Sequence, residues 1–214
     1  MRFYDCRTAP SPRRVRIFIA EKGIEIETIE VDLGSKEQLS SEFKKINPNC
    51  TVPVLLLDDG TRYTSTAGIR NYLEALHPTP NLMGKSAMER GMVADTQWRI
   101  EMEGQVAMAE ALRNSAPRMS GRALTGPFDY QQIPALAERG KLRVERFLNG
   151  VDSLIGNKAY AAGDFFSVAD IDLLVVIDFA KWIKLELPKD AVNAQRWYEN
   201  VSSRESCKLS LIHI

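Results

Sequence analysis

The chain has 214 residues, of which 44% are hydrophobic and 26% charged, as in an ordinary globular protein with one large domain or two small ones. Its 28 lysines and arginines are matched by 28 aspartates and glutamates, which argues against binding to nucleic acid or to an anionic membrane surface. The three cysteines are odd in number and lack metal-ligand spacing, so neither a disulfide framework nor a metal site is expected.

Met1 leads directly into a predicted strand, which leaves no room for a signal peptide. No apolar run approaches the ~18 residues that a membrane span needs. We therefore expect a cytoplasmic protein that does not enter a membrane.

The first half of the chain alternates between strand and helix patterns. We expect strands at residues 2–4, 25–31, 54–57 and 62–63, and helices at residues 11–22, 37–46 and 66–76. Period-two alternation in the second strand predicts one buried face. The order strand, helix, strand, helix, strand, strand, helix indicates a mixed sheet that begins with a parallel β-α-β unit.

A proline-rich linker follows these elements. Pro78 and Pro80 prevent the preceding helix from continuing, and after them strand signals almost vanish. Helices are expected at residues 87–114, 130–154, 168–183 and 191–202. We predict an α/β plus all-α architecture, with a first domain at residues 1–77, a linker at 78–86 and an all-helical domain at 87–204.

Pro53 occupies the predicted start of the third strand, where a proline does least harm to the hydrogen bonds of a sheet. One interpretation is an ordinary trans proline at a strand edge. The other is a cis proline, which would turn the backbone of Val52 outward and free it to pair with an extended, peptide-like ligand. We predict the cis form, with the Val52 backbone facing a ligand.

Three segments in order along the chain carry a resemblance to a known family: residues 4–17 (YDCRTAPSPRRVRI), Val52-Pro53 at the strand start, and residues 167–171 (SVADI). Together they resemble the glutathione S-transferase family from Met1 to about Arg204. The resemblance implies a thioredoxin-like N-terminal domain, a helical-bundle C-terminal domain and a homodimer. It also implies glutathione as the co-substrate and a small apolar electrophile as the second partner.

Ser11 is the candidate catalytic residue. It stands before Pro12 at a helix start, among unpaired backbone N–H groups and at the positive end of the helix dipole, a place that favours an anion such as the thiolate of glutathione. Simple capping of the helix is the competing interpretation. Thr8 is the rival hydroxyl, because Ala9 stands where many members of the family carry their catalytic serine.

The resemblance also implies glutathione contacts at Ser11, Thr51, Val52, Pro53, Ser65 and Thr66. Ser65 and Thr66 stand where the family usually has Glu-Ser and holds the γ-glutamyl group at a helix start. Thr51 stands where the family often has a lysine that contacts the glycyl carboxylate. Cys50 stands where glycine is common.

Three arginines, Arg13, Arg14 and Arg16, form a basic cluster on the first helix. The cluster is either a solvated face paired with acids such as Glu21 or a set of contacts for an anionic tripeptide. The sequence leaves both interpretations open.

Trp98 and Met102 lie on the first long helix of the second half, which lines the acceptor pocket in the family, although an apolar helical stripe is more often core. Asp170 follows Ser167 by three residues, and this capping-box pattern favours a role in folding over one in catalysis. The tail at residues 205–214 ends in an apolar segment, residues 209–214, that is unlike the usual ending of the family. We interpret the tail as a candidate sequencing artefact.

The leading functional prediction is a glutathione transferase that joins the glutathione thiolate to a small electrophile. One alternative is a glutathione-dependent disulfide reductase that uses two glutathione molecules. Ser11, where relatives have cysteine, argues against a mixed disulfide with the protein. The other alternative is a binding protein with the same fold and no catalysis, which the absent Glu and Lys favour.

Overall fold

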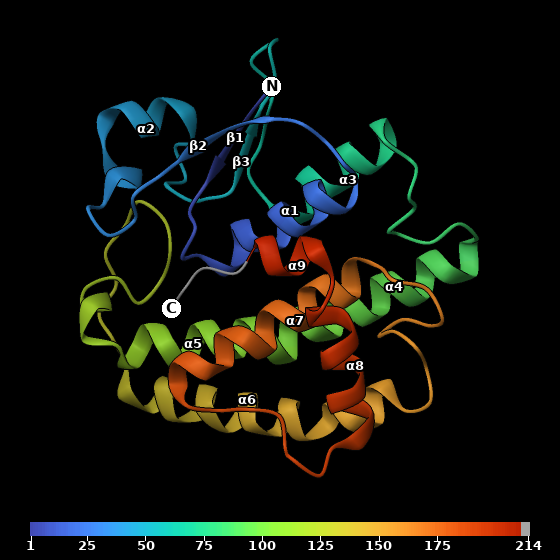
Figure 1. Cartoon of the computed structure of the whole chain (residues 1–214). Coiled ribbons are helices and arrows are strands. Elements are labelled where there is room, and N and C mark those ends of the chain that lie inside the picture. Colours follow the sequence, from blue (N-terminus) through green and yellow to red (C-terminus); the bar gives the residue numbers. More distant parts are fainter. Residues whose placement is uncertain (211–214) are drawn as a thin grey trace.

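The structure, a computed structural model, describes residues 1–210. Four strands form one mixed sheet in the order β2-β1-β3-β4 (Figure 1). Their bounds are Arg2–Asp5 for β1, Glu27–Glu30 for β2, Val54–Leu56 for β3 and Arg62–Tyr63 for β4. β1 and β2 are parallel and the other neighbours are antiparallel, which confirms the predicted mixed sheet with a parallel start.

The helices of the first half cover both faces of this sheet. They are α1 (Pro10–Glu21), α2 (Ser41–Ile46) and α3 (Thr66–Leu76), the last with the predicted bounds. Phe3 and Leu55 point into the core shared with α1 and α3, whereas Tyr4 and Val54 point to a smaller cluster with Phe43 of α2. The alternation follows from the period of two along a strand.

Two predictions for this half need correction. The expected helix 37–46 is divided into a 3₁₀ turn, η1 (Glu37–Leu39), and α2, because Ser40 is extended and its Oγ caps α2 by accepting from the Phe43 N–H at 3.1 Å. The second strand lacks the predicted buried face. It is a short edge strand in which Ile29 is half-buried and the other residues are exposed.

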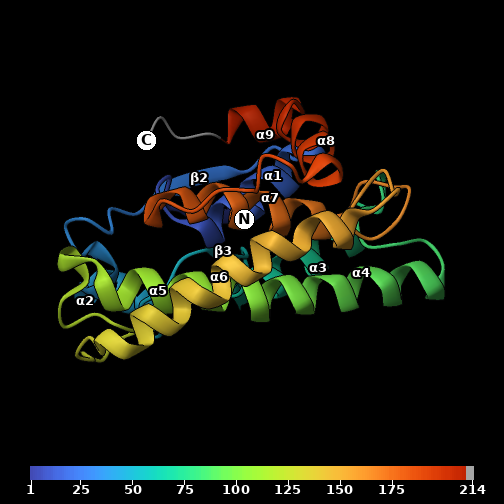
Figure 2. The same ribbon diagram turned by 90° about the horizontal axis from the view of Figure 1, so that it is seen from below.

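The second half is helical, as predicted. Its helices are α4 (Ala87–Arg99), α5 (Val106–Ser115), α6 (Pro134–Ile155), α7 (Val168–Ala180), α8 (Val192–Ser202) and α9 (Glu205–Leu209). Short helical turns follow α5 and α7 as η3 (Pro117–Met119) and η4 (Lys181–Ile183). Figure 2 shows α6 crossing the line of α4 and α5.

A π-helical segment, η2 (Ile100–Gln105), joins α4 to α5. The predicted helix 87–114 is therefore one continuous rod with a local change in winding, a feature that is frequent at functional sites.

α7 lies at the centre of the molecule, between α1 on one side and α4 and α5 on the other (Figure 1). All its residues except Phe179 are buried. Because its neighbours include α1 as well as α4 and α8, one apolar core runs from Phe3 and Phe18 to Val176 and Trp197. The two halves are thus packed as one body.

Residues 205–210 pack against α1. The carboxylate of Glu21 accepts hydrogen bonds from Arg204 and Ser206, and Arg13 Nε donates to Ser210 Oγ at 3.2 Å. This part of the tail is a helix of the fold, with Cys207 buried in the core. Residues 211–214 lie outside the described residues, and the interpretation of the tail as an artefact stays a prediction.

Gly140 lies where α6 crosses α5. A Cβ at this position would lie 2.5 Å from Ala111 N and 2.9 Å from Ala107 O, both backbone atoms that cannot rotate away. We expect Gly140→Ala to force the helices apart and to lower the free energy of unfolding by about 1–3 kcal/mol. Urea denaturation measures this change.

Gly150 is the matched control on the same helix, since a Cβ there meets nothing within 4 Å. Gly150→Ala should raise the free energy of unfolding by about 0.5–1 kcal/mol, because alanine has the higher helix propensity. A similar change in stability for both variants would contradict the close approach of α5 and α6.

Candidate functional site

Three segments meet at one end of the sheet. β1 pairs with β3 in a register that sets Tyr4 opposite Val54, so the turn after β1 lies beside Val52 and Pro53. β3 pairs with β4 in a register that sets Leu55 opposite Tyr63, so the chain that leaves β4 toward α3 reaches the same end. The start of α1, residues 51–53 and the start of α3 are therefore neighbours, as the family resemblance implies.

Ser11 is the second residue of α1, and the N-cap is Ala9, whose side chain cannot form a capping hydrogen bond. The interpretation of Ser11 as an N-cap is thus wrong. Pro10 and Pro12 have no N–H, and the N–H of Arg13 donates to Ala9 O at 3.3 Å. Within residues 1–210, Ser11 has the one backbone N–H of this first turn that remains without an acceptor.

The hydroxyl of Ser11 is held by its neighbour one turn along. Arg14 Nη2 donates to Ser11 Oγ at 3.2 Å. No acceptor for the Ser11 O–H is found in the described part of the chain. Ser11 therefore presents two unused donors, its N–H and its O–H, at the positive end of the helix dipole.

Thr8, the rival hydroxyl, is exposed in the turn before α1. Its Oγ1 lies 3.4 Å from Sγ of Cys6, which is buried. Either atom can be the donor in this contact, so it does not by itself separate Thr8 from Ser11 as the hydroxyl donor.

The Val52–Pro53 peptide bond is cis, as predicted. Asn47 is buried and holds the segment that precedes this cis bond. Its Nδ2 donates to Thr51 O at 2.8 Å and to Thr51 Oγ1 at 3.0 Å. Cys50 has a φ of 54°, the left-handed conformation that suits the glycine common at this position in the family. The backbone N–H and C=O of Val52 form no hydrogen bond with other described residues.

Ser65 is the N-cap of α3, and its Oγ accepts from the N–H of Gly68 at 3.0 Å. Its side chain therefore serves the helix itself. The N–H groups of Thr66 and Ala67 have no acceptor among residues 1–210, so the first turn of α3 offers two backbone donors.

A buried carboxylate joins the two halves of the molecule beside this site. Asp172 of α7 accepts from Arg70 of α3 at 2.6 and 3.1 Å, in a bidentate pair. Gln97 of α4 donates to the same carboxylate at 2.9 Å, and Arg14 Nη1 lies 3.9 Å from it. Burial alone would raise the pKa of Asp172, but the two guanidinium charges and the hydrogen bonds hold it below the usual value.

The arginine cluster on α1 is not a solvated face. Arg13 and Arg14 are buried because α7 and η2 lie against α1, and each finds a carboxylate there. Arg13 pairs with Asp178 at 2.8 Å and Arg14 with Glu101 at 2.5 Å. Their partners lie in the second half of the chain, so the sequence analysis missed them. Asp172 had one signal, a charged residue inside an apolar helix, which needs a partner.

Asp170 has the structural role that the capping-box pattern predicts. The Ser167 N–H donates to it at 2.9 Å, and it also accepts from Ala161 N at 2.7 Å and Trp197 Nε1 at 2.8 Å. Burial raises the pKa of this carboxyl, and the hydrogen bonds oppose that rise.

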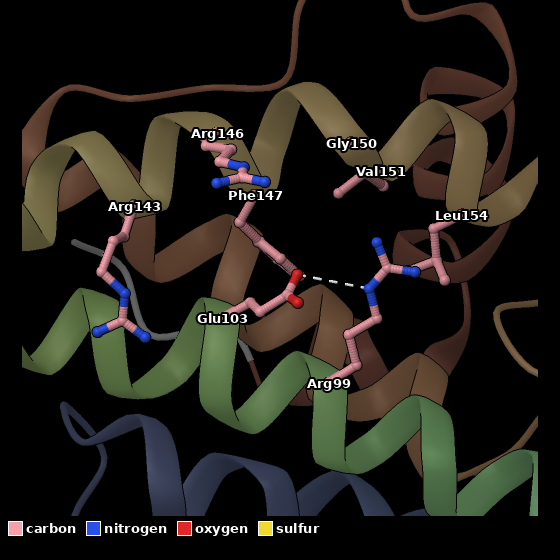
Figure 3. Close-up of a pocket in the computed structure, with 8 residues that line it drawn as sticks. All are labelled: Arg99, Glu103, Arg143, Arg146, Phe147, Gly150, Val151 and Leu154. Carbon is pink, nitrogen blue, oxygen red and sulfur yellow. Dashed lines mark hydrogen bonds and ion pairs between the residues drawn. The ribbon is translucent and has the colours of Figure 1, made fainter.

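Trp98 and Met102 are exposed, with 65% and 41% of their surface accessible. A cavity of about 310 Å³ lies between α4–η2 and α6 (Figure 3), and two of its lining residues adjoin Trp98 and Met102 in the sequence. Its lining consists of Arg99, Glu103, Arg143, Arg146, Phe147, Gly150, Val151 and Leu154. Neither predicted acceptor residue is part of that lining.

Two properties of the described residues bear on other classes of function. Residues 1–210 contain no group of three or more His, Cys, Asp or Glu side chains placed to hold a metal ion. None of the helices in this range is both long and apolar enough to cross a membrane.

Comparisons with known proteins match both halves of the chain. Residues 8–76 match the family model described as "Glutathione S-transferase, N-terminal domain", and residues 121–205 match "Glutathione S-transferase, C-terminal domain". Glutathione S-transferase 2 of Saccharomyces cerevisiae is 32% identical over 213 residues, which cover 97% of this chain and 88% of the yeast protein.

Solved structures give the same result. Gtt2 from Saccharomyces cerevisiae superposes with a TM-score of 0.89 at 30% identity, over 99% of this chain and 100% of that one. A glutathione transferase homologue from Sulfitobacter, solved with bound glutathione, has a TM-score of 0.81 at 21% identity, over 97% and 95% of the two chains. The second likeness concerns the fold alone.

Replacing Asp172 should weaken the contact between the two halves. Asp172→Asn leaves the buried charge of Arg70 without its counter-ion, so we expect the free energy of unfolding to fall by about 3 kcal/mol. Chemical denaturation at neutral pH measures this. Glu42→Gln is the control, because Glu42 forms an ion pair with Lys45 in which both side chains are exposed, and such a pair contributes at most about 1 kcal/mol.

The pH dependence of this effect has a definite sign. The folded protein holds the pKa of Asp172 below its ordinary value of 3.8, so its contribution is present above pH 3.8 and is lost as the pH falls further. The difference in stability between wild type and Asp172→Asn should therefore shrink in acid. A difference that stays constant below pH 3.8 would count against the charge network.

Proposed function

Because the chain belongs to the glutathione S-transferase family, we propose that it is a glutathione transferase that joins the glutathione thiolate to a small electrophile. The observation that carries this proposal is the pair of unused donors of Ser11 at the positive end of α1, beside the unpaired backbone of Val52. Together they provide a place for a sulfur anion on an extended, peptide-like ligand.

Each part of glutathione has matching groups in this arrangement. The N–H and C=O of Val52 are free to pair with the cysteinyl residue next to cis Pro53. The two backbone donors at the start of α3, Thr66 and Ala67, suit the γ-glutamyl carboxylate. The hydroxyl of Thr51 accepts from Asn47 and keeps its own proton for the glycyl carboxylate.

The chemistry consists of thiol ionisation followed by attack. A thiol of pKa ~8.5 is only a few per cent ionised at neutral pH, so two donors to the sulfur favour loss of its proton to solvent. The sulfur lone pair then forms the S–C bond. In a substitution, the leaving group departs with the electron pair of the bond that breaks. The protein contributes charge stabilisation and the positioning of both reactants.

The experiment combines binding and activity. Calorimetric titration with glutathione tests binding, and assays with an aryl halide and with a small disulfide separate the transferase from the disulfide reductase. Binding of glutathione with turnover of the aryl halide supports the proposal. Turnover of the disulfide alone would favour the reductase, and binding without any turnover would favour a binding protein.

Ser11→Ala should slow conjugation on the order of ten- to a hundredfold with little change in the glutathione Kd, because the hydroxyl acts mainly on the charged sulfur. Steady-state kinetics and the same titration measure the two quantities. Thr8→Ala is the matched control, since Thr8 loses only its contact with Cys6. Loss of activity in Thr8→Ala with full activity in Ser11→Ala would assign the role to Thr8 instead.

We further propose a homodimer that uses the outer face of α4 and α5. Five large apolar residues, between 39% and 77% exposed, follow this rod: Met88, Met92, Trp98, Met102 and Val106. Such an exposed stripe marks an interaction surface more often than free surface. Trp98 and Met102 thus have a candidate role in the interface beside the predicted one in the acceptor pocket.

The division into domains 1–77 and 87–204 and the cytoplasmic location stay predictions.

Sedimentation at micromolar concentration tests the dimer. We expect a species of about twice 24.1 kDa for the wild type and a shift toward the monomer for Trp98→Glu, which places a charge in the stripe. Val192→Glu is the control, because Val192 is 73% exposed on α8, away from the stripe. A wild-type protein that sediments only as a monomer would contradict the proposal.

A further inference from the structure

Arg14 connects Ser11 to the interface between the two halves. Its side chain is only 4% exposed. Nη2 donates to Ser11 Oγ at 3.2 Å, while Nη1 lies 2.5 Å from Glu101 of η2 and 3.9 Å from Asp172 of α7. Nε is buried and has no partner among the described residues. The guanidinium is thus placed beside the hydroxyl without using all of its own donors.

The bond from Arg14 determines how the Ser11 hydroxyl can act. A hydroxyl oxygen has one proton to donate and two lone pairs that accept. Arg14 occupies a lone pair, so the O–H must point elsewhere, and residues 1–210 offer it no acceptor. The contact with Arg14 therefore turns the serine into a donor toward the ligand.

The charges that face Arg14 decide how much positive potential reaches this position. Asp172 is already paired in a bidentate manner with Arg70, and Gln97 occupies one of its oxygens. The nearer counter-ion of Arg14 is Glu101, whose side chain is 45% exposed. Neutralising Glu101 would leave the guanidinium charge less balanced next to Ser11.

We propose, on the basis of the function proposed above, that Arg14 is a positioning residue that aims the Ser11 hydroxyl at the glutathione sulfur and supplies positive charge there, and that Glu101 limits this charge. Arg14 thereby acts on the thiolate through Ser11. The competing view is that Arg14 is only a structural link between the halves, as Arg13 is through its ion pair with Asp178.

The apparent pKa of the bound glutathione thiol is the readout, followed by the ultraviolet absorbance of the thiolate in the enzyme complex. Arg14→Gln should raise this pKa by about one unit and lower kcat/KM at neutral pH about tenfold, since a charge-assisted contact is lost. Glu101→Gln should move the pKa in the opposite direction, downward. Opposite signs distinguish a role in charge and orientation from a structural role, which predicts harm or no effect from both.

Two further variants separate charge from geometry. Arg14→Lys keeps the charge but loses the planar fork, so its thiol pKa should lie between those of wild type and Arg14→Gln. Arg13→Gln is the matched control: Arg13 is also buried on α1 and paired with an acid, but it does not contact Ser11. The pKa of the glutathione thiol bound to Arg13→Gln should equal that in the wild-type complex. Thermal unfolding checks that each variant folds.

An unchanged thiol pKa in folded Arg14→Gln would overturn the inference, as would a rise of the thiol pKa in Glu101→Gln. If Arg14→Gln does not fold, Arg14→Lys and Glu101→Gln still decide the matter, because Glu101 is partly exposed and its replacement leaves Asp172 paired with Arg70. A wild-type complex without a lowered thiol pKa would instead reject the proposed function, and the inference with it.

Discussion

The carboxylate of Asp172 lies inside the apolar helix α7, where an unpaired charge would be far too costly to bury. Its partners, Arg70 and Arg14, come from α3 and α1 of the other half. Satisfying this one charge therefore fixes the position of the first half against the second. The guanidinium of Arg14, which contacts Ser11, lies 3.9 Å from the same carboxylate and 2.5 Å from that of Glu101. The interface between the halves and the surroundings of Ser11 therefore share a charged residue, Arg14.

Two prolines limit the number of free donors at the start of α1. A helix usually begins with several N–H groups that need acceptors. Pro10 and Pro12 remove two of them, and the N–H of Arg13 is used within the turn. What remains is the N–H and the hydroxyl of a single serine. In the proposed function, the sulfur anion therefore has one place to bind at this helix start rather than several.

The rod formed by α4, η2 and α5 serves two sides of the molecule. Gln97 and Glu101 face the charge cluster beside α1, whereas the stripe that includes Trp98 and Met102 faces outward. The π-helical segment η2 contains both Glu101 of the inner face and Met102 of the outer face, which are adjacent in the sequence. A change in winding shifts the direction of the side chains that follow it.

The sequence by itself determined the features that depend on neighbouring residues. The order of the elements, the bounds of α3 and the capping box of Ser167 and Asp170 follow from local hydrogen bonds, from apolar periodicity and from the fixed φ of proline. The cis bond before Pro53 agrees with the prediction from its place at the strand start.

Only the tertiary structure decided the roles of the charged residues. Asp172 is 102 positions from Arg70, and Glu101 is 87 positions from Arg14. No periodicity along the chain reports contacts across such separations. Ser11 and Arg14 are only three positions apart, but the guanidinium that contacts the hydroxyl is also paired with Glu101, which only the tertiary structure brings to α1. Burial places two arginines of the basic cluster, Arg13 and Arg14, in ion pairs that join the two halves, because a charge removed from water must find its partner wherever the fold supplies one.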